Sequence, residues 1–218
     1  MIRPRELYIL VSQTNTGIAR LIRSVSGYPY NHVSVTLDPS LRRWYSFARY
    51  VQDAPLFGGL VSESVERLCD PDGDIQIRAY RVEIPEQKAK ELERLLENAG
   101  KPESGLIYNH FDAVACACGF RLPLPSCHTC LSFACEILEQ QHVSIESLCT
   151  ALEPFRFYEG SLRNLVAVSD SREDPYFVQN GLIYSIGHSI MLLGKLTFRT
   201  ISHGFFSHMA YRFHRTAQ

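Results

Sequence analysis

An α+β domain, in which an antiparallel sheet packs against separate helices, is the fold that the sequence predicts. Two observations predict it. Apolar and polar residues alternate over several short segments, as they do in strands that are buried on one face, and helical periodicity is confined to other segments. Hydrophobic residues make up 45% of the 218-residue chain, which is enough to bury a core. We divide the chain into a domain at 1–160 and a C-terminal helical extension at 161–218.

The expected strands follow the alternating pattern. Between residues 32 and 37, polar side chains alternate with apolar ones: His32, Ser34 and Thr36 with Val33, Val35 and Leu37. The same pattern predicts strands at 7–12, 43–49 and 74–84. Asp38-Pro39-Ser40 is expected to form a hairpin-like turn, and Gly58-Gly59 is expected to lie in a loop.

Pro85 is expected to open the clearest helix, because proline is tolerated at the first helical position. Gly100 is expected to end it. Further helices are expected at 17–26, 111–120, 129–141 and 182–198. The segment 182–198 is too short and too polar to span a bilayer. We expect it to pack on the domain, and contact with a membrane surface or a lid over the site are the alternatives.

Charge and cysteine content bound the class of protein. The chain has 22 basic and 23 acidic residues, a formal net charge of -1, and no block of like charge, which argues against a nucleic-acid-binding face. Seven cysteines are an odd number, and the N-terminus lacks the long apolar core of a secretory signal. We therefore expect a cytoplasmic protein with reduced thiols; its oligomeric state is left open.

Cys130 is the first candidate for catalysis. Thr129 can cap the helix at 129–141, which places Cys130 in the first turn. Unpaired backbone N–H groups and the helix dipole favour a thiolate there, and the same groups could form part of an oxyanion hole. Such positions lower a thiol pKa from about 8.5 to between roughly 3.5 and 7.5. The alternative is an ordinary buried cysteine.

His32 is the preferred base, because it stands at the head of a valine-rich strand just after a proline-containing turn. A histidine there can point across to a helix N-terminus. The alternative is a hydrogen-bonded structural histidine. His128 ranks second, since a loop neighbour two residues from Cys130 rarely reaches in-line geometry.

Cysteine spacing leaves two rival interpretations open. Cys127 and Cys130 form a CxxC pattern, and Cys116-Ala117-Cys118 adds a CxC pattern, so four thiolates could bind zinc. The apolar surroundings of Cys116 and Cys118 lack the turn residues of a zinc knuckle. A thioredoxin-type redox site would need its first cysteine at the helix start, within a βαβ unit. We expect no metal and no cofactor.

Two halves of the sequence resemble the permuted NlpC/P60 papain-like superfamily, in particular its YiiX/YaeF-like group. The first half is carried by Ser12–Thr16 and Tyr30–Val35, and the second by Cys130–Leu138, which is similar to the family's nucleophile helix. Tyr45–Arg49 and Phe57–Val61 resemble a subgroup of uncharacterised bacterial members. The resemblance covers about residues 7 to 160. It implies a circularly permuted papain-like fold with the histidine before the cysteine.

The resemblance also implies a third polar residue that orients the histidine, on the strand after the histidine strand. This sequence offers Ser46 there, and no acid. The predicted catalytic residues are thus Cys130, His32 and Ser46. We expect a thiol hydrolase that cleaves an amide or ester in a small-molecule, peptide or lipid-amide substrate through a thioester acyl-enzyme. The alternatives are an acyltransferase with the same intermediate and a non-catalytic binding or redox protein.

Overall fold

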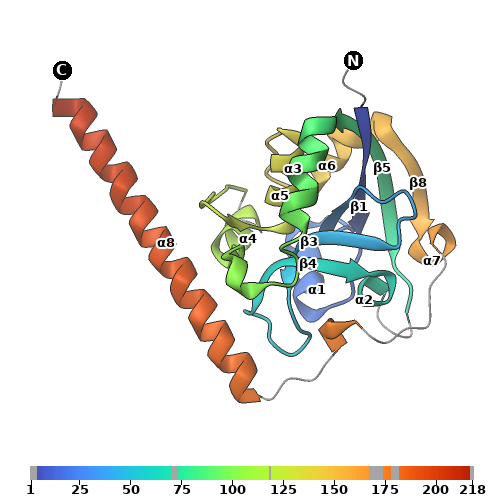
Figure 1. Cartoon of the computed structure of the whole chain (residues 1–218), viewed down its shortest axis with the longest axis horizontal. Helices are drawn as coiled ribbons and strands as arrows, with labels where there is room; N and C mark the ends of the chain where they lie inside the picture. The colour runs from blue at the N-terminus through green and yellow to red at the C-terminus, as the bar shows by residue number, and fades with distance from the viewer. Residues whose placement is uncertain (1–3, 70–72, 118, 167–173, 178–181, 217–218) are drawn as a thin grey trace.

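One eight-stranded sheet organises the molecule (Figure 1). The computed structural model describes residues 4–69, 73–117, 119–166, 174–177 and 182–216. In these residues the strand order is β7-β6-β4-β3-β2-β1-β5-β8. The strands are β1 (Pro4–Ser12), β2 (His32–Thr36), β3 (Arg43–Arg49), β4 (Gly58–Ser64), β5 (Gln76–Pro85), β6 (Ile107–Tyr108), β7 (Cys127–His128) and β8 (Arg156–Ser161). Within this part of the chain, β6 and β7 are parallel and the other neighbours are antiparallel.

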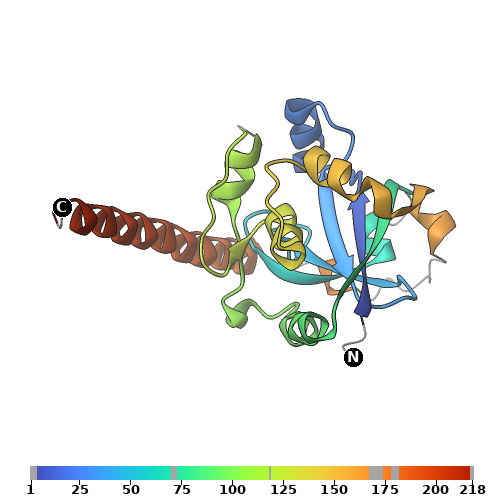
Figure 2. The ribbon, with the colours of Figure 1, turned by 90° about the horizontal axis from the view of Figure 1, so that it is seen from above.

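The helices lie on both faces of the sheet and beside it (Figures 1 and 2). They are α1 (Gly17–Ser26), α2 (Val65–Cys69), α3 (Glu86–Leu96), α4 (His110–Ala117), α5 (Cys130–Leu138), α6 (Ile145–Leu152), α7 (Leu162–Leu165) and α8 (Leu182–Thr216). Three short 3-10 helices are η1 (Pro102–Ser104), η2 (Glu153–Phe155) and η3 (Pro175–Phe177). The predicted α+β class is confirmed.

Strand alternation sends apolar side chains to opposite faces of the sheet, so each face has its own core. On one face, Val33 and Val35 of β2 pack with buried residues of α3, α5 and α6. On the other face, Trp44 of β3 packs with buried residues of α2 and α7. A third cluster at the β6–β7 edge includes Leu192 and Leu196 of α8. Helix α5, which begins at Cys130, thus lies on the same face as the valines of β2.

Several predicted elements agree closely with the structure. The helix at 17–26 and the strand at 43–49 have the predicted bounds, and α5 covers most of the helix expected at 129–141. Asp38-Pro39-Ser40 connects the antiparallel strands β2 and β3, as expected. Pro85 precedes the first helical residue of α3 and serves as its N-cap. Local patterns therefore located most of the elements that frame Cys130 and His32.

The elements differ from the expected ones in four places. Gly58-Gly59 does not lie in a loop but begins β4, because Gly59 pairs with Ile107 and a Cβ atom there would lie 2.3 Å from the Leu106 carbonyl oxygen. The glycines permit the close approach of β4 and β6 rather than a turn. The helix expected at 182–198 continues to Thr216. Helix α6 was not expected at all. Strand β8 also crosses the boundary drawn at residue 160.

Candidate active site

Cys130 is the first residue of α5, as the sequence predicts. The Thr129 side chain accepts a hydrogen bond from the Ser132 backbone N–H at 3.0 Å, and the Ser132 hydroxyl accepts one from the Thr129 N–H at 2.7 Å. This capping box uses two of the N–H groups at the start of the helix and leaves those of Cys130 and Leu131 without an intrahelical acceptor. Cys130 is 8% exposed. A buried thiol therefore sits where the helix dipole favours its thiolate.

His32 enters the site from the opposite side, at the first position of β2. The turn before it is fixed by Asn31, whose side-chain oxygen accepts a bond from Arg23 at 2.8 Å and whose amide donates to the Thr14 hydroxyl at 2.7 Å. Helix α1 ends just upstream at Gly27, which adopts φ 67°. Since a left-handed residue ends the helix there, the chain can turn directly into β2. The hydrogen bonds of Asn31 and the helix end at Gly27 thus fix the position of His32 at the start of β2.

Glu63 of β4 is the residue that binds the His32 imidazole. The His32 Nε2 atom lies 3.0 and 3.1 Å from the two carboxylate oxygens of Glu63. The Ser34 hydroxyl donates to the same carboxylate at 2.7 Å. Glu63 is 3% exposed. A buried carboxylate that accepts a bond from one imidazole nitrogen fixes the tautomer and orientation of the ring, which is the role of the third residue in a catalytic triad.

The prediction that Ser46 binds His32 is wrong. The Ser46 hydroxyl is buried and has no hydrogen-bond partner among the described residues. Ser46 lies on β3 opposite Val61, whereas Glu63 lies opposite Trp44. The acid therefore comes from the second strand after His32, and its carboxylate reaches across β3. Glu63 was missed because the glycines before it made β4 look like a loop; a lone acid among Leu60, Val61 and Ser62 was the available signal.

A second layer of side chains surrounds Glu63. The Arg67 guanidinium on α2 lies 3.9 Å from Glu63 Oε1 and 4.3 Å from the centroid of the Tyr176 ring. Tyr176 is 7% exposed, and its hydroxyl accepts a bond from Arg49 at 2.6 Å. Asp174 accepts a bond from the Ser64 hydroxyl at 2.7 Å. The segment 174–177, which the sequence placed in the extension, therefore covers Arg67 and Ser64, the neighbours of Glu63.

The charges in this row of side chains shift one another's pKa values. Burial would lower the pKa of His32, but the negative charges of Glu63 and of a Cys130 thiolate outweigh it and raise that pKa to about 10. Burial would raise the pKa of Glu63, but the His32 charge and hydrogen bond, together with Arg67, lower it to about 2. Glu63 is therefore ionised at neutral pH and His32 is stabilised as the imidazolium.

The same balance acts on Cys130. Burial would raise the pKa of its thiol, but the charge of His32, a side-chain hydrogen bond with His32 and a hydrogen bond from the Val33 backbone lower it. The four interacting side chains thus follow one another in the order Cys130, His32, Glu63 and Arg67. Such an arrangement favours a thiolate–imidazolium pair, and its two members titrate together.

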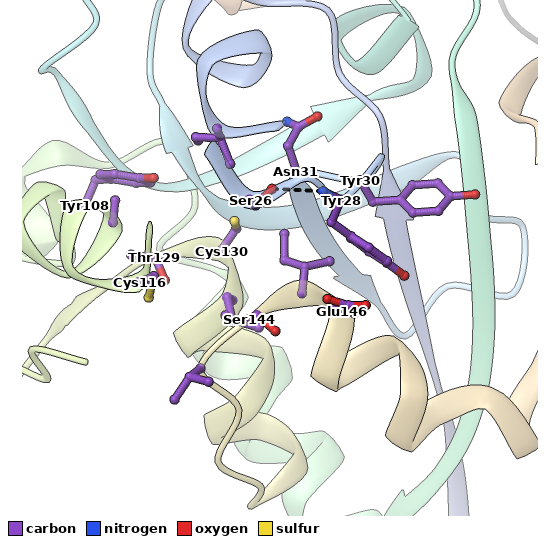
Figure 3. Close-up of a pocket in the computed structure, with 15 residues that line it drawn as sticks. Ser26, Tyr28, Tyr30, Asn31, Tyr108, Cys116, Thr129, Cys130, Ser144 and Glu146 are labelled. Carbon is purple, nitrogen blue, oxygen red and sulfur yellow. Dashed lines mark hydrogen bonds between the residues drawn. The ribbon is translucent and has the colours of Figure 1, made fainter. Parts of the chain in front are cut away.

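A pocket opens beside Cys130 (Figure 3). It encloses about 680 Å³ when its open mouth is included. Its lining is mostly aromatic and aliphatic, with Tyr28 and Tyr30 from the turn before β2, Tyr108 from β6 and Leu131 from α5. Asn31 and Glu146 are its more polar members. The sulfur of Cys130 is therefore accessible to a compound bound in this pocket.

The rival histidine and cysteines lie in other surroundings. His128, the second-ranked base, has its Nδ1 atom 3.3 Å from Glu136 and its ring 4.9 Å from that of Phe47. Cys127 belongs to the third core cluster, with Leu192 and Leu196 of α8. Cys116 lines the pocket, and burial raises the pKa of its thiol to about 11. Cys118 lies outside the described residues. No group of three or more potential metal ligands occurs among the residues that the structure covers.

The chain matches no family model, no curated protein and no solved structure. In the described part of the chain, no helix is long and apolar enough to cross a membrane.

Proposed function

We propose that this protein is a cysteine hydrolase that cleaves an amide or ester bond, with Cys130 as nucleophile, His32 as general base and acid, and Glu63 as the residue that orients His32. The observation that supports it best is the bond between the His32 imidazole and the buried Glu63 carboxylate. It sits next to a cysteine whose thiol pKa is lowered at a helix N-terminus. Nucleophile, base and orienting acid form the arrangement that activates a weak nucleophile.

The order of these residues along the chain supports a circularly permuted papain-like fold as part of this proposal. The histidine comes from a strand that precedes the nucleophile helix. The helix presents its N-terminus to the strand, and the helix packs on the face of the antiparallel sheet that carries Val33 and Val35. These are the features that the sequence resemblance implied, with Glu63 in place of Ser46.

The reaction follows from the geometry. The Cys130 thiolate attacks the carbonyl carbon of a substrate bound in the pocket, and a tetrahedral oxyanion forms. The backbone N–H groups of Cys130 and Leu131 can stabilise that oxyanion. His32 gives its proton to the leaving amine or alcohol, and a thioester remains on Cys130. Neutral His32 then takes a proton from water, the water attacks the thioester, and the acid product leaves with the thiolate restored. An alcohol or amine in place of water would give acyl transfer.

The proposal is tested with an activated acyl ester and intact-mass spectrometry. We expect one acyl group per chain, mapped to Cys130 and lost in Cys130→Ala. Cys135→Ala is the matched control, because Cys135 is a buried cysteine of the same helix whose thiol pKa is raised by burial. His32→Ala should slow both acylation and hydrolysis by at least about a hundredfold. Acylation that survives Cys130→Ala, or that maps to another cysteine, contradicts the proposal.

A further inference from the structure

The longest helix, α8, extends away from the domain. Figures 1 and 2 show it attached to one side by its N-terminal part, with the rest of its length running outward. At a rise of about 1.5 Å per residue, its 35 residues span about 50 Å. The attachment is made by Leu192 and Leu196, both buried against the β6–β7 edge, and by Arg199, which donates to the Gly105 carbonyl at 3.0 Å. One side of the N-terminal half is therefore fixed to the protein.

The side of α8 that faces away from the protein is apolar. Among the residues of α8 whose burial is described, six large apolar ones are exposed, including Phe198 at 72% and Ile190 at 66%; the others are Tyr184, Ile186, Met191 and Ile201. With about 100° per residue, these six fall within an arc of about 160° whose centre is opposite Leu192 and Leu196. A helix that only packs on its domain turns its apolar side inward and a polar side outward. Here the outward side is apolar as well.

The charged residues of α8 all have one sign. Residues 182–216 contain Lys195, Arg199, Arg212 and Arg215, and all 23 acidic residues of the protein lie elsewhere. Because the whole chain has a formal net charge of -1, the remainder of the protein is net acidic. Lys195 is exposed and borders the apolar arc. An apolar face bordered by a lysine, on a helix whose charges are all positive, matches the boundary between the acyl chains and the head groups of an anionic bilayer.

We propose that α8 binds the surface of an anionic lipid bilayer through the face that carries Ile190 and Phe198. A second copy of the chain fits less well, because paired helices without acidic residues would bring cations together with no opposite charge on either helix. Bilayer contact buries the apolar arc and places Lys195 at the head groups. Helix α8 packs on β7, which ends two residues before Cys130. A bilayer bound to α8 would therefore lie close to the pocket beside Cys130. The proposal does not depend on the chemistry of Cys130.

The test is sedimentation of the full-length protein with vesicles of phosphatidylcholine alone or mixed with phosphatidylglycerol. We expect binding to the mixed vesicles, weakened by added salt, and weaker binding to phosphatidylcholine alone. The double variant Ile190→Ser, Phe198→Ser should bind at least about tenfold more weakly. The matched control is Val25→Ser, Phe155→Ser, which removes exposed apolar side chains from α1 and η2. Lys195→Gln should weaken binding to the mixed vesicles only.

Three results would overturn the proposal. The first is that the wild-type protein stays in the supernatant with both kinds of vesicle, and the second is that the double variant binds as the wild type does. The third is a wild-type dimer, seen by light scattering, that the double variant loses while no vesicle is bound; this would assign the face to a second copy. Circular dichroism and the alkylation rate of Cys130 show that the variants are folded, and neither should change.

Discussion

Replacing the Glu63 carboxylate by an amide, in Glu63→Gln, tests whether this acid controls the thiol. The pKa of His32 is raised from 6.5 to about 10, which corresponds to about 5 kcal/mol in favour of the imidazolium. Among the effects that raise it, the charge of Glu63 is the largest. Without that charge, burial, which is the largest single effect, is opposed only by the smaller ones, and the pKa of His32 should fall toward its ordinary value.

The effect on Cys130 has two parts of opposite sign. The charge of Glu63 acts directly on the thiol and raises its pKa, but this is the smallest of its five causes. The charge of His32 lowers the pKa of Cys130 far more. Loss of the imidazolium in Glu63→Gln should therefore return the thiol toward an ordinary pKa of about 8.5, at which about 1% is thiolate at pH 6.5.

The assay is the pH dependence of Cys130 alkylation by iodoacetamide. The wild type should react well below pH 8, and Glu63→Gln should react about a hundredfold more slowly at pH 6.5 and recover at higher pH. Glu63→Asp should lie between the two, because it keeps the charge and shortens its reach. Glu83→Gln on the exposed side of β5 is the control. A Glu63→Gln profile that superimposes on the wild-type profile refutes the role given to Glu63.

Three further predictions follow from the same residues. Ser46→Ala should leave the alkylation rate within about twofold of the wild type, because the Ser46 hydroxyl has no partner in the described structure; a tenfold loss would restore Ser46 to the site. In urea unfolding, Glu63 has a lowered pKa, so its stabilisation is present above about pH 4.5 and lost as the pH falls through about 2. His32 has a raised pKa, so its stabilisation is present below about pH 6.5 and lost as the pH rises through about 10. The difference in unfolding free energy between wild type and Glu63→Gln should therefore shrink steadily above about pH 6.5. A difference that stays constant with pH contradicts the ion pair. Tyr176→Phe removes the bond from Arg49 but keeps the ring beside Arg67, so it should cost about 1 kcal/mol in thermal unfolding, less than Tyr176→Ala.

The sequence located Cys130 and His32 because both assignments depend on local chemistry. A threonine before a helix caps it wherever the chain folds, so Cys130 could be placed in the first turn. His32 was identifiable because it opens a valine-rich strand just after a proline-containing turn. The contact between them is a matter of tertiary structure, and only the resemblance to a permuted family suggested it.

Glu63 could not be found in this way, because its role depends on which strands are neighbours. The carboxylate belongs to β4, lies two strands from β2 and reaches His32 across β3. The glycines that begin β4 have a high turn propensity, and the reason for their presence is the backbone of β6, more than 40 residues later. Long-range strand pairing of this kind leaves no signal in a window of a few residues. Segment 174–177 was missed for the same reason.

The cover that Tyr176 and Asp174 place over Arg67 has a consequence for the order in which the site is assembled. Synthesis runs from the N-terminus, and Cys130, His32 and Glu63 all leave the ribosome before Asp174 does. A nascent chain that ends before Asp174 therefore holds all three of these residues while the side of Arg67 that Tyr176 covers still faces water. Water weakens the attraction between the charges of Glu63 and Arg67. The ion pair of Glu63 with Arg67 then reaches its full strength only when segment 174–177 docks.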